Sequence, residues 1–244
     1  MSQASNSALV QVSALRLNLA RRAVLDIDEL IIERGQFILL TGANGAGKTT
    51  LLKVLAGLLR ADSAFFHCLG TAMSVTAAAK FCRGRHIYLH QTPYLFDTTV
   101  AENIAYGLKQ RGRDPEQRRI EIRDALGWAK LEHLIDRPAR ELSTGERQRV
   151  ALTRARILSP SLLLLDEITA NMDSDSRLRS FELIDDLRRS GSSVVYATHN
   201  QESVIDIADA SVELTSGRIQ RKPAAAADVI PLRRDHNNPD GPGA

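Results

Sequence analysis

Residues 37–59 read FILLTGANGAGKTTLLKVLAGLL, and this order of an apolar run, a glycine-rich loop and a helical segment decides the fold. Residues 37–40 predict a short buried strand, and the apolar spacing after Thr49 predicts a helix. Between them, GANGAGKT at residues 42–49 matches the phosphate-binding pattern GxxxxGK[ST], the P-loop, in the context that the pattern requires. A plain glycine-rich turn is the alternative, and the flanking elements disfavour it.

The loop contains several groups suited to a nucleoside triphosphate. Its glycines let backbone N–H groups converge on phosphate oxygens, and the following helix adds its dipole. Lys48 can neutralise the β- and γ-phosphates, and Thr49 can offer its hydroxyl to Mg²⁺. The residues of this loop that we expect to bind nucleotide are Gly42, Asn44, Gly45, Gly47, Lys48, Thr49 and Thr50.

Two adjacent carboxylates follow a second buried run. Residues 162–165 are LLLL, and Asp166 and Glu167 come directly after them. Parallel α/β sheets place their ligands at the carboxyl ends of strands, so this is a Walker B arrangement. We expect Asp166 to hold Mg²⁺, usually through a water, and Glu167 to polarise the attacking water as general base. An acidic pair that stabilises a helix N-terminus is the alternative, and the P-loop upstream disfavours it.

Kinases, helicases, GTPases and transport ATPases share these two motifs, and a third element distinguishes among them. Residues 142–149 read LSTGERQR. This stretch resembles the LSGGQ signature of the ATP-binding cassette (ABC) family, and it precedes the Walker B pair as in that family. A Ser hydroxyl and a Gly N–H at a helix N-terminus make an anion site. The resemblance implies that Ser143 and Gly145 bind the γ-phosphate held by a second copy of the chain.

The remaining motifs of the ABC family follow in order along the chain. Gln91 in IYLHQTPYLF matches the Q-loop, Asp173 in ANMD the D-loop, and His199 in YATHN the switch histidine. The resemblance implies that Gln91 reaches Mg²⁺ and the attacking water, His199 the γ-phosphate, and Asp173 the site of the second copy. The expected catalytic set is therefore Glu167, His199, Gln91 and Lys48, and the expected metal set is Thr49, Gln91 and Asp166.

The sequence departs from the family pattern at several positions. Thr144 and Glu146 replace the first Gly and the Gln of the signature, Ile168 stands where Pro is common, and the D-loop reads ANMD rather than SALD. None of these changes removes a catalytic group. Leu19 takes the place of the aromatic residue that the family stacks on adenine, so we expect weak discrimination between ATP and GTP.

The rest of the chain fits an α/β fold around the P-loop. Apolar residues alternate in the first 32 residues and predict paired strands, which form an N-terminal antiparallel β subdomain. Helical spacing within 98–155 predicts a helical subdomain that carries the signature, broken by the polar turn RGRDPEQ. The mainly parallel P-loop NTPase core and both subdomains make one nucleotide-binding domain over 8–222. Residues 223–244 are rich in Ala, Pro, Asn and Gly and predict a disordered tail.

Composition narrows the class of protein. The 244 residues are 43% hydrophobic and 25% charged, which is typical of a soluble globular chain. No apolar run reaches the roughly 18 residues of a membrane span, and no secretory signal opens the chain, so we expect a cytoplasmic protein. The net charge of +3 is scattered rather than gathered into a stripe, which argues against nucleic acid as a partner.

The chain has only two cysteines, Cys68 and Cys82, a number typical of a protein in a reducing compartment rather than of a disulfide-rich one. Together with His67 and His86 they could be four metal ligands. Their spacing matches no familiar zinc pattern, so we expect them to be ordinary packing residues.

These residues predict an ATPase that binds ATP and Mg²⁺. The resemblance implies that ATP hydrolysis drives a transporter and that the chain lies on the cytoplasmic face of the inner membrane. The expected partners are a second copy in a head-to-tail dimer, a separate integral membrane permease, and a periplasmic or extracellular substrate-binding protein. A free-standing cassette without fused spans favours import. The alternatives are a non-transport ABC ATPase, which usually carries a coiled-coil insertion or two cassettes, and a P-loop kinase, which leaves the signature unexplained.

Residues 90–108 give the two remaining expectations. Tyr94, Leu95 and Phe96 follow Gln91 and predict an apolar patch where the family docks its permease, although buried core is the alternative. The stretch HQTPYLFDTTVAENIAYGL resembles subunits of bacterial oxyanion importers, most of all the tungstate type. This cargo is implied by the resemblance alone, because the cargo is bound by other subunits.

Overall fold

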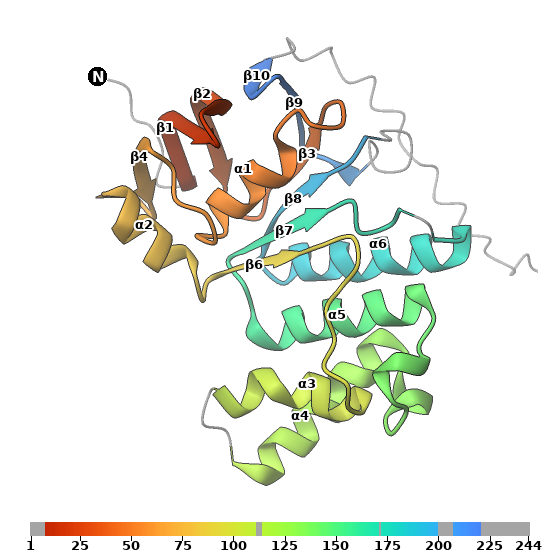
Figure 1. The fold of residues 1–244 in the computed structure, drawn as a ribbon. Coiled ribbons are helices and arrows are strands. Elements are labelled where there is room, and N and C mark those ends of the chain that lie inside the picture. Colours follow the sequence, from red (N-terminus) through yellow and green to blue (C-terminus); the bar gives the residue numbers. More distant parts are fainter. Residues whose placement is uncertain (1–7, 111–113, 171, 200–206, 221–244) are drawn as a thin grey trace, which may run out of the picture.

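A mainly parallel sheet forms the centre of the protein, and the computed structural model describes residues 8–110, 114–170, 172–199 and 207–220 (Figure 1). The strand order in this sheet is β10-β9-β3-β8-β7-β6. Its strands are β3 (Phe37–Thr41), β6 (His86–Leu89), β7 (Leu162–Asp166), β8 (Ser193–Ala197), β9 (Ala210–Thr215) and β10 (Arg218–Gln220). Every neighbouring pair is parallel except β9 and β10. The predicted α/β class with a mainly parallel sheet is confirmed, whereas β9 and β10 were not predicted.

The central strands are buried on both faces, and alternate residues enter two different cores. Leu163 and Leu165 of β7 join the cluster formed with the helices on one face. Leu162 and Leu164 join the cluster formed with the helix after the P-loop and with the N-terminal sheet. A strand covered on both faces needs a continuous apolar run, which explains the sequence LLLL.

The N-terminal sheet is antiparallel, as predicted, with the order β2-β1-β4-β5. Its strands are β1 (Ala8–Leu19), β2 (Arg22–Glu33), β4 (Ser63–Cys68) and β5 (Thr71–Met73). Along β1 the buried positions change from Val10 and Val12 to Leu15 and Leu17. Ala14 has φ 48°, and the pairing of β1 with β4 shifts register between Ser13 and Arg16. This irregularity inserts the extra residue that keeps both apolar pairs on the buried face.

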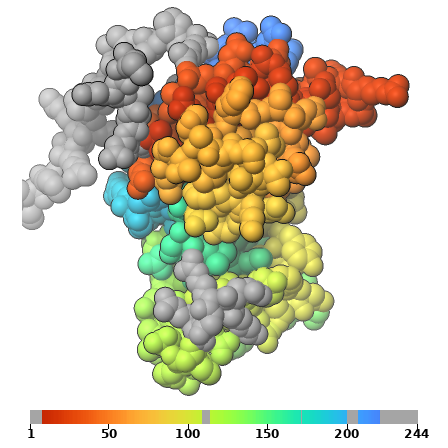
Figure 2. Space-filling model, turned by 90° about the vertical axis from the view of Figure 1, so that its left-hand side faces the viewer, coloured from red at the N-terminus to blue at the C-terminus, as the bar shows by residue number. Residues whose placement is uncertain are grey.

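Six α-helices and two 3₁₀ turns complete the described chain. The α-helices are α1 (Lys48–Leu55), α2 (Val75–Cys82), α3 (Val100–Gln110), α4 (Pro115–Ala129), α5 (Thr144–Leu158) and α6 (Ser174–Arg189), and the 3₁₀ turns are Glu132–Leu134 and Ala139–Glu141. In Figure 1, α5 and α6 lie along one face of the central sheet, and α1 lies on the other side, toward the N-terminal sheet. Helices α3 and α4 contact α5 and extend the molecule away from the sheet. They lie in the lower part of Figure 2.

Two expected helix boundaries were wrong. The segment TTLLKVLAGLL does not stay helical to its end, because α1 stops at Leu55 and Gly57 adopts φ 71°. The last part of the predicted polar turn RGRDPEQ is helical instead, because Asp114 caps α4 with its side chain and Pro115 takes the first helical position. That Asp-Pro pair is a helix start signal that the turn assignment overlooked.

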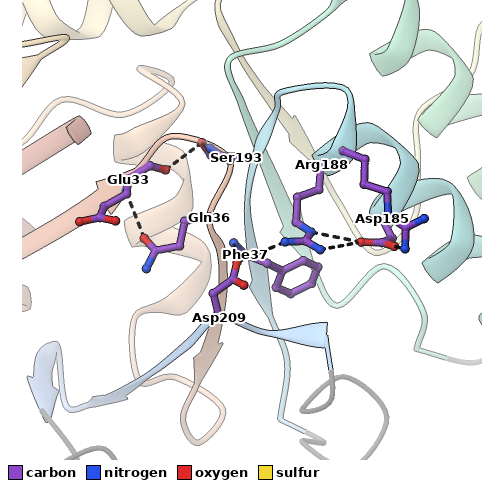
Figure 3. Close-up of polar contacts among 9 residues, drawn as sticks. Glu33, Gln36, Phe37, Asp185, Arg188, Ser193 and Asp209 are labelled. Carbon is purple, nitrogen blue, oxygen red and sulfur yellow. Dashed lines mark hydrogen bonds and ion pairs between the residues drawn. The ribbon is translucent and has the colours of Figure 1, made fainter. Parts of the chain in front are cut away.

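A polar network fixes the start of β3, at the opposite end of the strand from the P-loop (Figure 3). The Asp209 carboxylate accepts the N–H of Phe37 at 2.7 Å and lies 3.5 Å from the Arg188 guanidinium. Arg188 also donates through Nε to Asp185 at 3.1 Å. The Ser193 hydroxyl accepts the N–H of Gly35 and donates to the carbonyl of Glu33, each at 2.9 Å. The strand that delivers the P-loop is therefore anchored to both α6 and β8.

Cys68 and Cys82 are buried and not joined by a disulfide, and α2, which ends at Cys82, packs on β4. Within the residues described, no three His, Cys, Asp or Glu side chains come together as a metal site would need. In the same residues, no helix combines the length and apolarity needed to cross a bilayer. The predicted tail at 223–244 lies outside the described residues, and the domain limits 8–222 and 98–155 stay predictions.

Candidate functional site

The P-loop joins β3 to α1 through a backbone that only glycine adopts easily. Gly42, Gly45 and Gly47 have φ of 144°, 79° and 106°. A Cβ on Gly42 would lie 2.2 Å from the carbonyl oxygen of Leu214 on β9. A second contact ties the loop to the β9–β10 turn, because the Gly217 N–H donates to the Ala46 carbonyl at 2.9 Å. The loop therefore needs glycine both for its conformation and for its close approach to β9.

Lys48 lies across the loop rather than pointing into solvent. Its side chain is only 6% exposed, and its Nζ donates to the carbonyls of Gly42 at 2.7 Å and Ala43 at 3.2 Å. A buried ammonium needs such acceptors. These carbonyl bonds hold the charge where phosphate oxygens could replace one of them. Asn44 is exposed and Thr50 is half-buried.

The Walker B aspartate accepts two hydrogen bonds on one oxygen. Thr49 Oγ1 donates to Asp166 Oδ2 at 2.7 Å, and Tyr88 Oη donates to the same atom at 2.8 Å. Asp166 is 5% exposed, so these donors replace water. Burial, together with the bond to Asp166, raises the pKa of the Tyr88 phenol, which keeps it a donor. The sequence analysis missed Tyr88.

Glu167 has a strained backbone conformation, and its carboxylate lies near His199 and Lys48. Its φ is 51°, a left-handed conformation that is uncommon for a non-glycine residue, and its N–H donates to the carbonyl of Ala197 at 2.9 Å. Its Oε1 lies 3.1 Å from Nδ1 of His199 and 3.9 Å from Nζ of Lys48. The strain points the carboxylate toward these groups instead of along the strand.

Gln91 lies just beyond β6, at the same edge of the sheet as the two carboxylates. Leu89 is opposite Leu165 in the parallel pair of β6 and β7, so Gln91 leaves β6 beside the end of β7. Its side chain is half-buried. The structure thus brings the P-loop, the Walker B pair, Gln91 and His199 to one edge of the sheet.

The signature segment begins α5, and Glu146, one of its departures from the family pattern, takes part in the cap of this helix. Ser143 is the N-cap, and its hydroxyl accepts the N–H of Glu146 at 3.3 Å. The Glu146 carboxylate in turn accepts the N–H of Ser143 at 2.8 Å, which completes a capping box. Partial burial opposes ionisation of Glu146, but the bonds from Ser143 and the charges of Arg137 and Arg149 leave its pKa lowered. Glutamate therefore stabilises the loop in place of glutamine.

Gly145 and Asp173 meet through Ser176, a residue that the sequence analysis also missed. A Cβ on Gly145 would lie 2.7 Å from Ser176 Oγ and 2.9 Å from Ser176 Cβ, so α5 and α6 touch here. Asp173 caps α6 by accepting the N–H of Ser176 at 2.8 Å, and this bond lowers the pKa of Asp173. The signature and the D-loop are thus one packed unit, although Asn171 of the D-loop lies outside the described residues.

The predicted site residues fall into two groups. The first lies around Lys48 and Asp166, and the second consists of Ser143, Gly145 and Asp173. Among the described residues, no hydrogen bond or ion pair joins Ser143, Gly145 or Asp173 to the group around Lys48 and Asp166. Ser143 and Asp173 are exposed. The first group can bind a triphosphate and polarise a water, and the second presents the N-terminus of α5, where Ser143 and Glu146 already form a capping box. Leu19, 41% exposed beside the β1–β2 turn, offers no aromatic face, so weak base discrimination stays a prediction.

The oxygen donors of the first group fit Mg²⁺. A threonine hydroxyl and a carboxylate are the hard ligands that this ion prefers, and it usually keeps waters and substrate phosphates as the others. Thr49 and Asp166 already lie within 2.7 Å of each other. The glycine cradle and the ammonium of Lys48 suit the phosphate oxygens that would complete the shell.

Comparison with protein families agrees with the geometry. The family model described as ABC transporter matches residues 25–170. The sulfate/thiosulfate import ATP-binding protein CysA of Nephroselmis olivacea is 36% identical over 200 residues, covering 81% of this chain and 57% of the relative. The spermidine/putrescine import ATP-binding protein PotA of Haemophilus influenzae is 32% identical over 220 residues, covering 89% of this chain and 58% of the relative. The chain spans less than two thirds of the length of these relatives.

A solved structure has the same fold. It is cbiO1 from Clostridium perfringens, described as part of the ABC transporter complex cbiONQ, with a TM-score of 0.80 and 25% identity. The match covers 88% of each chain.

Proposed function

The chain belongs to the ABC transporter family, and from this premise we propose that it binds and hydrolyses ATP to power a transporter whose permease is a separate chain. The observation that carries the proposal is the position of Glu167. Its strained backbone points Oε1 between His199 and Lys48, next to the Asp166 and Thr49 pair. A carboxylate held in this way can accept a proton from a water that attacks a phosphate in the P-loop.

Each predicted residue has a role in this proposal. Lys48 exchanges a loop carbonyl for phosphate oxygens, and His199 orients the Glu167 carboxylate and reaches the γ-phosphate. Thr49 and Asp166 would hold Mg²⁺, which when bound offsets the charge of the β- and γ-phosphates. Gln91, just beyond the end of β6, would be a further group directed at the metal and the attacking water.

A second copy of the chain completes the site in our proposal. Exposed Ser143 and buried Gly145, at the start of α5, form the proposed anion site, which the first group does not use. Two chains arranged head to tail would each supply this helix N-terminus, with Asp173, to the triphosphate held by the other. Hydrolysis should then require the dimer, because neither copy has a complete site.

The permease is the second partner that we propose, with a substrate-binding protein outside the membrane and no nucleic acid. We propose that the chain works on the cytoplasmic face of the membrane and drives import. Relatives named as import ATP-binding proteins support this, and they favour a transporter over a non-transport ATPase. The contact that we propose is the aromatic pair Tyr94 and Phe96, which follows Gln91. Tyr94 is 77% exposed, and its ring lies 5.6 Å from the ring of half-buried Phe96, whereas Leu95 is buried in the core.

We expect Tyr94→Ala and Phe96→Ala to weaken permease binding about 30-fold, since truncation of a central aromatic residue at an interface costs about 2 kcal/mol. The measurement is co-purification of a polytopic membrane protein from detergent-solubilised membranes, with the ATPase rate of the free subunit recorded alongside. Phe65→Ala is the matched control, because Phe65 is 67% exposed on the N-terminal sheet. Equal capture by all four proteins, wild type included, would rule out this contact.

The cargo that we propose is an oxyanion, with tungstate as the specific candidate. The resemblance of residues 90–108 to oxyanion importers supports the class, as do relatives named for sulfate/thiosulfate import. Other relatives are named for spermidine/putrescine and for Fe(3+) import, so similarity of this subunit alone does not fix the cargo.

Deletion of the gene should reduce cellular uptake of tungstate, and of its tetrahedral analogue molybdate, at limiting external concentration. Metal content by mass spectrometry is the measurement, with labelled sulfate uptake as the comparison within the oxyanion class. Normal content of all three anions in the deletion strain would contradict the cargo proposal, and it would leave the ATPase proposal standing.

A further inference from the structure

The Asp166 carboxylate accepts a hydrogen bond from Tyr88, three residues before Gln91, to which the motifs assign no role. Tyr88 lies on β6, which pairs in parallel with β7, and its Cα is opposite Leu164 rather than Asp166. The phenol therefore reaches forward along the sheet to donate to Asp166 Oδ2 at 2.8 Å. Its ring packs against the core that contains Leu164, so the hydroxyl is delivered by a fixed side chain.

The two donors to Asp166 Oδ2, Thr49 and Tyr88, differ in whether a bound metal would also affect the position of the hydroxyl. Thr49 is the expected metal ligand, so the position of its hydroxyl is set by the metal as well as by Asp166. Tyr88 reaches Asp166 from a neighbouring strand, and its place is set by the sheet. It is thus the donor whose geometry is independent of the metal.

We propose that Tyr88 is a positioning residue for the metal: it holds the Asp166 carboxylate in the orientation that receives Mg²⁺ or a Mg²⁺-bound water. This inference rests on the proposed function of the site as a Mg²⁺–ATP site.

Removal of the hydroxyl isolates this role. Tyr88→Phe keeps the ring and its packing, and leaves Asp166 Oδ2 with Thr49 as its donor. Residues that orient metal ligands typically contribute 10- to 100-fold to metal affinity, and we expect about 10-fold here because one donor remains. ATP binding in EDTA should stay unchanged, since no contact of Tyr88 with the P-loop is involved.

The probe is Mn²⁺, titrated into the protein with saturating ATP and followed by electron paramagnetic resonance, and a parallel titration of Mn²⁺ into ATP in buffer gives the protein-free signal. All proteins carry Glu167→Gln so that ATP persists. A fluorescent ATP analogue in EDTA gives the metal-free affinity. Tyr106→Phe is the matched control, because it removes the same hydroxyl from a 46% exposed ring on α3. Tyr88→Met, which also lacks a hydroxyl, serves if the phenylalanine variant does not fold.

The expected result is a Mn²⁺ dissociation constant about 10-fold weaker for Tyr88→Phe only, with equal affinity for the analogue in EDTA. A Mn²⁺ dissociation constant within twofold of that of the protein with Tyr88 intact would overturn the inference. An equal loss of ATP affinity in EDTA would overturn it too, because it would reveal a structural role. If the protein with Tyr88 intact takes up no more Mn²⁺ than ATP binds in buffer without protein, the proposed function fails instead.

Discussion

Glu167→Gln should lower ATP hydrolysis by about 10²- to 10⁴-fold, the usual contribution of a general base, while ATP still binds. Glutamine has the same shape and can keep the contact with His199 and the left-handed backbone at φ 51°. It cannot accept a proton from water. Phosphate release measured under saturating ATP gives the rate, and filter binding of labelled ATP gives the affinity.

Glu132→Gln is the matched control, because it makes the same chemical change at an exposed carboxylate of the helical subdomain. Its hydrolysis rate should equal that of the wild type. A Glu167→Gln rate within threefold of the wild type would mean that another group polarises the water.

Gly145→Ala should lower hydrolysis about 10- to 100-fold, because the added Cβ would lie 2.7 Å from Ser176 Oγ and 2.9 Å from Ser176 Cβ. The start of α5 must then move away from α6, and this movement displaces the Ser143 cap and the proposed anion site. The substitution by itself favours a helix, since alanine has the higher helical propensity. A loss of activity would therefore report the contact between the helices rather than the stability of α5.

Two further variants sharpen this prediction. Gly127→Ala on α4 is the control, because its Cβ would meet only Glu132 Oε1 at 3.5 Å, an ordinary contact. It should leave hydrolysis unchanged. Ser176→Gly in the Gly145→Ala protein removes both colliding atoms and should restore part of the rate. Steady-state hydrolysis and thermal melting of the four proteins, including wild type, give the answer, and equal rates for Gly145→Ala and Gly127→Ala would refute it.

The main elements of the fold could be predicted because their patterns are local. The LLLL run needs burial on both faces, and the P-loop needs a strand before it and a helix after it, so short stretches of sequence predicted these parts. The irregularity at Ala14 was also readable in principle. The buried residues change from even to odd positions between Val12 and Leu15, and only an extra residue keeps both on one face.

The parts that were not predicted depend on contacts between distant segments. Strands β9 and β10 are short, and their importance lies in the approach of Leu214 and Gly217 to the P-loop. Tyr88 is an ordinary strand residue until the parallel register of β6 and β7 is known. The Gly145 contact with Ser176 requires the packing of two helices. The functional roles of the predicted residues stay predictions, since they concern ligands and a second chain.

The most direct test of the central claim, that this chain hydrolyses ATP at a site completed by a second copy, is the mass of Glu167→Gln in ATP by analytical ultracentrifugation. We predict a monomer without nucleotide and a species of twice that mass with ATP, because Ser143 and Gly145 of each copy then bind the triphosphate that the other copy cannot hydrolyse. A protein that binds ATP and remains a monomer at every concentration would contradict the claim.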